Sequence, residues 1–210
     1  DSIGFPKLYN SLMESFEYYS NHSLMGNISG NHDIPRFISY ASKALSFMED
    51  EKEAGWTRNI EIIDTIGYNK LKLLSAFNLT IPGVPVIYYG DEIGMVGAGD
   101  PDNRRPMIFD GLNKYQEGVK KTIKQLFSLR ADNIALAYGE FNLIHISNDL
   151  FVYERGYLNN KVIVMLNKSD KEITLPNIKE ISSYENHFNS TIQSEQIVLP
   201  PYSFDIYTKK

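Results

Sequence analysis

The spacing of apolar residues changes once along this chain, after Ala137, and that change constrains the possible folds more than any other feature. Before it, apolar residues recur at helical spacing and alternate with two short apolar runs. After it the period is two, and short apolar stretches are separated by polar turns. This order predicts βα units followed by a separate antiparallel β-sandwich. The predicted fold class is α/β plus all-β, with domains at residues 1–137 and 138–210.

Individual elements follow from the same spacing. Pro6 suits a first helical turn because its missing N–H needs no partner there. The helical stripes are Phe5, Leu8, Leu12, Phe16 and Tyr19; Ile38, Ala41, Leu45 and Met48; Leu71, Leu74, Phe77 and Asn78; and Val119, Ile123, Leu126 and Phe127. Strands are expected at residues 24–29, 84–89, 151–153, 162–166, 173–175, 197–199 and 204–207. We expect the run 84–89 to be buried on both faces, and Asn159-Asn160 to form a hairpin turn.

Composition limits the possible partners and sites. The chain is 42% hydrophobic, which is ample for a core, and its net charge of −5 comes without the basic stripe that nucleic acid requires. No apolar run approaches the roughly 20 residues that span a bilayer. The absence of cysteine excludes disulfides and thiolate metal sites, and the isolated His22, His145 and His187 argue against zinc. Neither observation determines the compartment.

Polar side chains gather where the two predicted barrel-type strands end. Asn31, His32 and Asp33 follow the first strand, and Asp91 and Glu92 follow the second. Because active sites of βα barrels lie at the carboxyl ends of the strands, these residues are a candidate site; the alternative is that they cap the following helices. The long Gly- and Pro-rich segment over residues 90–111 is more than a connector and is expected to be functional.

Three motifs in this order resemble the α-amylase clan, glycoside hydrolase family 13. Asn31-His32-Asp33 matches the fourth motif of that clan, although Ile28 stands where the clan has Phe. Residues 82–95 look like the eighth barrel strand with its loop. Residues 100–107 are similar to the loop of the neopullulanase, cyclomaltodextrinase and oligoglucosidase branches. As a whole, the chain most resembles the neopullulanase, cyclomaltodextrinase and maltogenic amylase branch. The resemblance implies the last βα units of a TIM-type (β/α)8 barrel, followed by a carboxyl-terminal antiparallel β-sandwich.

The resemblance also implies roles for particular residues. Asp33 would be the catalytic stabiliser of the oxocarbenium-like transition state, and His32 and Asn31 would bind the same sugar ring. Asp100 and Arg104 would hold the next sugars on the donor side. For Arg104 a salt bridge within the loop is an equal alternative. Arg105 is expected to be structural.

The clan's Asp nucleophile and Glu acid/base follow strands that have no counterpart here, so the resemblance places both upstream of Asp1. We therefore expect the carboxyl-terminal portion of a retaining α-glucan hydrolase acting on starch, maltooligosaccharides or cyclodextrins. The chain alone is expected to be inactive. It needs no cofactor, although calcium is possible in the parent protein. Exposed strand edges favour association with itself or with the rest of the parent.

Two alternatives remain open at this stage. One is a non-catalytic, amylase-like partner subunit, which preservation of the sugar site argues against. The other is a carbohydrate-binding module formed by the sandwich, in which no aromatic platform is evident. Tyr88 and Tyr89 are expected to pack in the barrel, Glu92 to tighten the strand-end loop, and Trp56 to belong to the core rather than to a sugar platform. The preferences for α-1,4 over α-1,6 bonds and for hydrolysis over transglycosylation are not determined.

Overall fold

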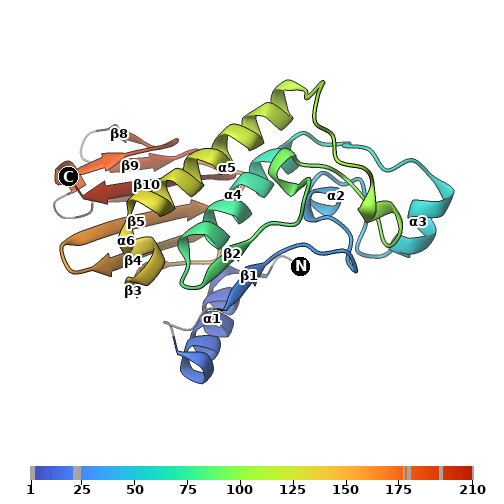
Figure 1. The fold of residues 1–210 in the computed structure, drawn as a ribbon. Coiled ribbons are helices and arrows are strands. Elements are labelled where there is room, and N and C mark those ends of the chain that lie inside the picture. The colour runs from blue at the N-terminus through green and yellow to red at the C-terminus, as the bar shows by residue number, and fades with distance from the viewer. Residues whose placement is uncertain (1–2, 21–24, 177, 179–180, 194–195, 210) are drawn as a thin grey trace. The chain divides into compact units, whose positions relative to one another are not determined.

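The computed structural model describes residues 3–20, 25–176, 178, 181–193 and 196–209, which form two compact units (Figure 1). The sandwich unit comprises the described residues of segments 1–25, 79–84 and 127–210. The motif unit comprises residues 26–78 and 85–126 and contains Asn31, His32 and Asp33. The division between residues 137 and 138 remains a prediction. Among the described residues, no helix is long and apolar enough to cross a membrane.

The sandwich unit consists of two antiparallel sheets. Its strands are β3 (Glu140–Ile146), β4 (Leu150–Tyr157), β5 (Asn160–Asn167), β6 (Ile173–Pro176), β7 (Tyr184–Asn186), β8 (Thr191–Gln193), β9 (Gln196–Leu199) and β10 (Ser203–Lys209). One sheet has the order β3-β4-β5-β10-β7, and the other has the order β6-β9-β8. Buried residues from both sheets form one core, including Val152, Ile163 and Ile197. The predicted antiparallel sandwich is therefore confirmed.

The five strands predicted in the sandwich from period-two apolar runs are all present. Strands β3, β7 and β8 were not predicted, because β3 is largely exposed and the other two are only three residues long. The hairpin turn lies one residue earlier than expected, since Tyr157 pairs with Asn160 and Leu158 has the positive φ of 51°. Asn160 instead belongs to β5, where its Oδ1 accepts a hydrogen bond from the Ala135 N–H at 2.9 Å.

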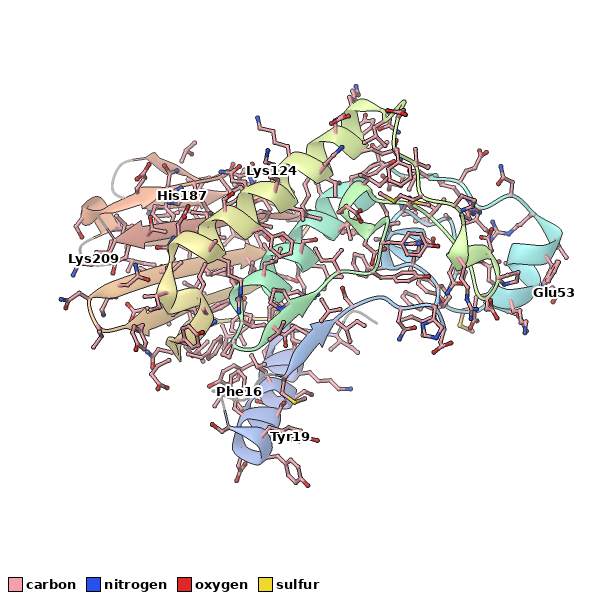
Figure 2. The ribbon with its side chains drawn as sticks, viewed as in Figure 1. Phe16, Tyr19, Glu53, Lys124, His187 and Lys209 are labelled. Atoms are coloured by element: carbon pink, nitrogen blue, oxygen red, sulfur yellow. The ribbon has the colours of Figure 1, made fainter. Side chains whose placement is uncertain are left out.

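Helix α1 (Phe5–Tyr19) confirms the first helical stripe but not its complete burial. Its aromatic side chains pack on the sheet: the rings of Phe5 and Phe151 lie 5.5 Å apart, and those of Phe16 and Phe141 lie 5.7 Å apart. Only Phe5 is buried, and Leu8 is exposed. Tyr19, labelled in Figure 2, is also exposed. The expected inward face therefore extends over only part of the helix.

The motif unit contains short strands and most of the helices. Its elements are β1 (Gly26–Ile28), α2 (Phe37–Ala41), α3 (Glu51–Thr57), α4 (Ile66–Thr80), β2 (Val84–Val86), the 3-10 turns η1 (Asp91–Ile93) and η2 (Asp102–Arg104), and α5 (Lys114–Asp132). The short helix α6 (Ile134–Tyr138) belongs to the sandwich unit, as do the ends of α4, β2 and α5. Helices α4 and α5 lie side by side in Figure 1 and share a core through Leu71, Val119 and Ile123.

Two expectations for the helical stripes are wrong. The stripe from Ile38 to Met48 is helical only as far as Ala41, because Lys43 has a positive φ of 63° and turns the chain, leaving Met48 94% exposed. Phe127, expected to face inward on α5, is exposed. The stripes on α4 and the rest of α5 are confirmed by the buried Leu71, Val119, Ile123 and Leu126.

The two strands that precede the motif residues are shorter than predicted. Residue 24 lies outside the described residues, and β1 begins at Gly26. Strand β2 was expected to be buried on both faces, but Val84 and Val86 are exposed. The reason is that β1 is the only neighbour of β2 among the described strands.

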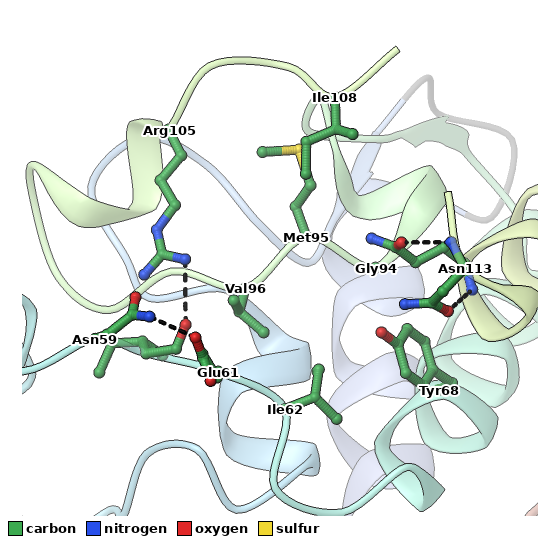
Figure 3. A pocket seen from close by; sticks show the side chains of 12 residues that line it. Asn59, Glu61, Ile62, Tyr68, Gly94, Met95, Val96, Arg105, Ile108 and Asn113 are labelled. Atoms are coloured by element: carbon green, nitrogen blue, oxygen red, sulfur yellow. Dashed lines mark hydrogen bonds between the residues drawn. The ribbon is translucent and has the colours of Figure 1, made fainter. Parts of the chain in front are cut away.

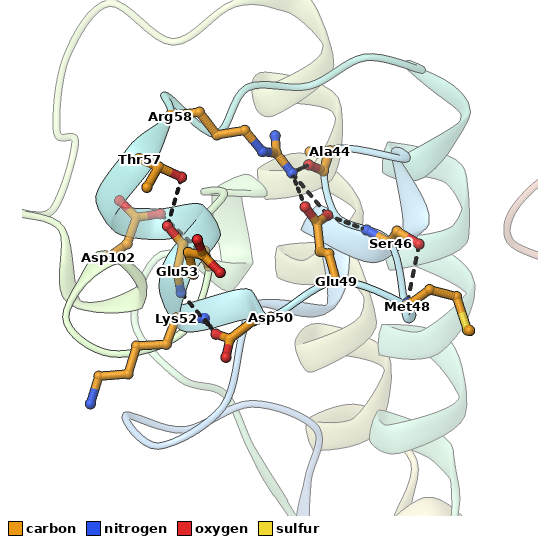
Figure 4. A network of polar contacts seen from close by, with 11 residues as sticks. Ala44, Ser46, Met48, Glu49, Asp50, Lys52, Glu53, Thr57, Arg58 and Asp102 are labelled. Carbon is orange, nitrogen blue, oxygen red and sulfur yellow. Dashed lines mark hydrogen bonds and ion pairs between the residues drawn. The ribbon is translucent and has the colours of Figure 1, made fainter.

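The acidic stretch at residues 49–53 is exposed or half-buried, in line with its charge, and it also has a local structural role (Figure 4). Asp50 caps α3 by accepting hydrogen bonds from the backbone N–H groups of Lys52 at 2.9 Å and Glu53 at 2.8 Å. Glu49 accepts hydrogen bonds from Arg58 on both carboxylate oxygens, at 2.9 and 2.8 Å. These contacts fix the loop that leads into α3.

Candidate functional site

Asn31, His32 and Asp33 form one tight turn after β1. The Asn31 Oδ1 accepts a hydrogen bond from the backbone N–H of Asp33 at 2.7 Å, the side-chain-to-backbone contact of an Asx turn. The turn brings the His32 Nε2 to 3.3 Å from the Asp33 Oδ1. The side chains of His32 and Asp33 are 64% and 67% exposed, so both are accessible to a ligand.

Arg104 connects this turn to the loop over residues 97–105. Its Nε donates to the His32 carbonyl at 3.0 Å and lies 3.1 Å from the Asp100 Oδ1. Its Nη2 lies 3.8 Å from the Asp33 Oδ1. The fold therefore brings the predicted residues together, and Arg104 also makes the loop salt bridge that was its alternative interpretation. The sugar-binding roles of these residues remain predictions.

Arg36 joins the ends of the two strands, a role that was not predicted from the sequence. It is 1% exposed; its Nη1 donates to the Asp91 Oδ1 at 2.8 Å and to the Tyr89 carbonyl at 2.7 Å. Its Nε donates to the Asn103 carbonyl at 3.1 Å. The guanidinium carbon lies 4.6 Å from the ring centroid of Tyr88, within cation–π range. Burial of this charge is compensated by one carboxylate and two carbonyl groups.

Asn103 is the second residue whose importance only the structure shows. It is fully buried, and its Nδ2 donates to the Ile34 carbonyl at 2.8 Å. Gly97 allows this close approach, because a Cβ there would lie 2.6 Å from the Asn103 Cα. The loop is also held by Ser39, whose Oγ donates to the Gly97 carbonyl at 2.9 Å and accepts from the Gly97 N–H at 3.0 Å.

Asp91 lies in an unusual electrostatic environment. Burial raises the pKa of Asp91 to about 6, and it outweighs the neighbouring Arg36 guanidinium, which acts to lower that pKa. The charge of Glu92 adds a smaller rise to the pKa of Asp91. Within the described residues, the Glu92 Oε2 is buried without a hydrogen-bond partner, so no contact of that atom supports the expected tightening of the loop.

Three further side chains depart from or match the expectations. Arg105 is structural as predicted, since it binds both oxygens of Asp102, at 2.8 and 2.9 Å, and the Ile60 carbonyl at 3.1 Å. Tyr89 is 38% exposed, and its hydroxyl donates to the Arg105 carbonyl at 2.9 Å. Trp56 was expected in the core but is 70% exposed on α3.

Within the described residues, no group of three or more His, Cys, Asp or Glu side chains is placed to hold a metal ion.

Comparison with known proteins identifies the family. Residues 2–134 match the model of the α-amylase catalytic domain. The chain belongs to the α-amylase family. It is 33% identical over 153 residues to a cyclomaltodextrinase of Thermoanaerobacter pseudethanolicus, a match that covers 73% of this chain and 22% of that enzyme. It is 42% identical over 102 residues to a cyclomaltodextrin glucanotransferase of Bacillus sp. strain 1011, covering 48% of this chain and 14% of that enzyme.

The structural comparison concerns the fold and covers both units. An Anoxybacillus α-amylase superimposes with a TM-score of 0.71 and 24% identity, covering 99% of this chain and 43% of the solved chain. The chain thus has the α-amylase-family fold, with a carboxyl-terminal β domain after the barrel-type segment. It spans about a fifth of the length of the T. pseudethanolicus cyclomaltodextrinase (22%).

Proposed function

We propose that this α-amylase-family chain forms the sugar-binding part of the active site of a retaining α-glucan hydrolase. The proposed substrates are starch, maltooligosaccharides or cyclodextrins. The observation that carries the proposal is the exposed pair of His32 and Asp33 in one turn. Arg104 stabilises this turn by donating a hydrogen bond to the His32 carbonyl. The names of the relatives, a cyclomaltodextrinase and a cyclomaltodextrin glucanotransferase, support this choice of substrate class.

In the proposed mechanism, Asp33 and His32 act on one sugar ring. The carboxylate of Asp33 accepts hydrogen bonds from ring hydroxyls, and its negative charge stabilises the positive charge that develops on the ring. Such a contact accelerates the reaction because it strengthens in the transition state. The guanidinium of Arg104, 3.8 Å from the Asp33 Oδ1, orients the carboxylate, and Asp100 and Arg104 contact the next sugar.

We further propose that this chain does not hydrolyse glucans alone. A retaining glycosidase needs a nucleophile and an acid/base whose carboxyl groups lie about 5 Å apart. Among the described carboxylates near the turn, Asp33 and Asp100 pair with Arg104 and Asp91 pairs with Arg36, while the Glu92 Oε2 is buried without a hydrogen-bond partner, so these contacts leave no pair of accessible, unpaired carboxyls. The two reacting carboxyls are therefore proposed to come from residues outside this chain.

The test is a titration of the 210-residue chain with maltotriose, in which binding is monitored by the NMR signals of the backbone amides. We expect shifts at Asn31, His32 and Asp33, and a dissociation constant that rises roughly tenfold or more in His32→Ala and Asp33→Ala, because hydrogen bonds to charged groups are lost. The control is Asp110→Asn, which changes an exposed acid outside the turn, in the segment over residues 90–111, and should bind as wild type. Absence of shifts at the turn would contradict the binding proposal.

A parallel assay measures release of reducing sugar from maltoheptaose. We expect no turnover by wild type. Sustained hydrolysis that disappears in Asp33→Asn would show that the chain carries a complete site and would overturn the proposal that it is inactive alone.

A further inference from the structure

The motif unit contains a cavity of about 330 Å³ that the proposed mechanism does not use (Figure 3). Its volume lies at the lower end of the range of small-molecule sites, roughly 300–1,000 Å³. Its walls come from the segment before α4, the first turn of α4, the loops after η1 and η2, and the start of α5. None of the residues Asn31, His32, Asp33, Asp100 or Arg104 lines it.

Tyr68, a buried residue, supplies a hydroxyl to this cavity. The residue is 4% exposed, and its ring stacks on that of Tyr115 with centroids 5.4 Å apart and an interplanar angle of 8°. Figure 3 shows the hydroxyl directed into the cavity, and within the described part of the chain the structure gives it no hydrogen-bond partner. This hydroxyl can therefore donate a hydrogen bond to, or accept one from, a ligand in the cavity.

Two amide side chains at the start of α5 add hydrogen-bond donors. The Asn113 Oδ1 accepts from the backbone N–H groups of Tyr115 at 2.9 Å and Gln116 at 3.1 Å. The Gln116 Oε1 accepts from the backbone N–H of Asn113 at 3.0 Å. Because two N–H groups already donate to the Asn113 Oδ1, that side chain offers its NH₂ group to the cavity, whereas Gln116 offers its NH₂ group and the second lone pair of its Oε1.

The other residues that line the cavity indicate which chemical class of ligand it can bind. Glu61 contributes an acceptor carboxylate, already contacted by the Asn59 Nδ2 at 2.5 Å. The charge of Arg105, which also lines the cavity, is compensated by Asp102. Ile62 contributes aliphatic surface, as do Val96 and Ile108. A mixture of donors, an acceptor and aliphatic carbon without excess positive charge suits a neutral polyhydroxylated ring better than an anion.

We propose that this cavity binds one glucose unit of an α-glucan, as a second sugar site whose lining does not include His32 or Asp33. The hydroxyl of Tyr68 and the amides of Asn113 and Gln116 contact the sugar hydroxyls, and the aliphatic side chains contact its C–H face. The choice of glucose as the ligand rests on the proposed function. The presence of the cavity and of its unpartnered hydroxyl is independent of that function.

The experiment titrates the ¹⁵N-labelled 210-residue chain with maltotriose and follows two groups of amides. Gly94, Asn113 and Gln116 report on the cavity, and His32 and Asp33 report on the turn. Tyr68→Phe deletes only the hydroxyl and keeps the ring stack, so circular dichroism should be unchanged. We expect the dissociation constant read at the cavity to rise about fivefold in this variant, with no change at the turn.

Tyr115→Phe is the matched control, because it makes the same change on the ring stacked against Tyr68 without lining the cavity. Its affinity at the cavity should equal that of wild type. Glu61→Ala, at an exposed residue, provides a second variant and should also weaken binding at the cavity.

The possible outcomes separate the two proposals. Shifts at the turn alone would overturn the cavity site and leave the proposed function intact. Shifts at the cavity alone, weakened by Tyr68→Phe, would support the cavity site and contradict the function proposed for the turn. An equal loss in Tyr68→Phe and Tyr115→Phe would indicate an effect of ring packing and would overturn the role given to the hydroxyl.

Discussion

At the residue scale, the site depends on side chains that never face solvent. Arg36 lies three residues after Asp33 in the sequence, yet its contacts are with Asp91 and Asn103, which are 55 and 67 positions away. A buried guanidinium is tolerated only when its N–H groups find acceptors, and most of those of Arg36 do. Its Nη2 is an exception among the described side-chain atoms, since it is buried without a partner.

The raised pKa of Asp91 predicts a specific pH dependence of stability. Its pKa is about 6 in the folded chain against an ordinary 3.8, which corresponds to about 3 kcal/mol. Because the folded pKa is the higher one, this contribution is complete below the ordinary value and is lost as the pH rises through about 6. The free energy of unfolding of wild type minus that of Asp91→Asn should therefore fall by up to about 3 kcal/mol between about pH 4 and pH 7, measured by urea denaturation.

Asp64 provides a control of opposite sign. The backbone N–H of Ile66 and, to a smaller extent, the Lys43 ammonium hold the pKa of Asp64 below its ordinary value. The difference between wild type and Asp64→Asn should rise, not fall, as the pH increases from the acid range. A wild-type minus Asp91→Asn difference that does not change with pH would contradict the buried, high-pKa assignment.

At the element scale, the carboxyl end of α4 is held by arginine side chains of the sandwich unit. The last carbonyl groups of a helix lack intrahelical partners. The Arg130 Nη1 donates to the Leu79 carbonyl at 2.8 Å, and the Arg155 Nη1 donates to the Thr80 carbonyl at 2.5 Å. The Arg155 Nη2 donates to the Gly139 carbonyl at 2.8 Å. Burial lowers the pKa of Arg155 to about 10, so the guanidinium stays charged at neutral pH.

Removal of the Arg155 guanidinium should be strongly destabilising. Arg155→Met keeps most of the side-chain volume but leaves buried carbonyl groups without donors, so we expect a loss of about 2–4 kcal/mol in the free energy of unfolding. Arg58→Met is the control, because Arg58 is 41% exposed and its pair with Glu49 lies at the surface. It should cost no more than about 1 kcal/mol. Equal losses in the two variants would refute the role given to Arg155.

At the scale of the whole molecule, the strands of the motif unit lack the neighbours that barrel strands have. Among the described strands, β1 and β2 pair only with each other, and Ile28 and Val86 are 54% and 39% exposed. Unpaired strand edges beside apolar side chains favour association with another chain. The cyclomaltodextrinase and the cyclomaltodextrin glucanotransferase that match this chain are several times longer than the matched segment.

We therefore expect the isolated chain to self-associate. Sedimentation velocity should show species larger than the monomer, and Val86→Lys should shift them toward the monomer by placing a charge at the strand. Phe109→Lys is the control, since Phe109 is an exposed apolar residue of the loop rather than of the sheet. A compact wild-type monomer that binds no hydrophobic dye would contradict this expectation.

The sequence by itself determined the features that repeat over a few residues or that consist of residues adjacent in the chain. Period-two runs located five sandwich strands, helical spacing located α1, α4 and α5, and adjacent motif residues marked the turn of Asn31, His32 and Asp33. Local backbone preference and alternating burial produce those patterns within a few residues, so they can be read from the sequence.

Only the tertiary structure decided which side chains are buried against which. Nothing local separates the buried Arg36 from the exposed Arg104, or the buried Tyr68 from the exposed Trp56. Burial is set by segments distant in the chain, as when Gly97 lets Asn103 approach the strand end. The shared core of α4 and α5 likewise places Tyr68 at the wall of a cavity. Such contacts depend on the packing of the whole unit, and for that reason no short stretch of sequence encodes them.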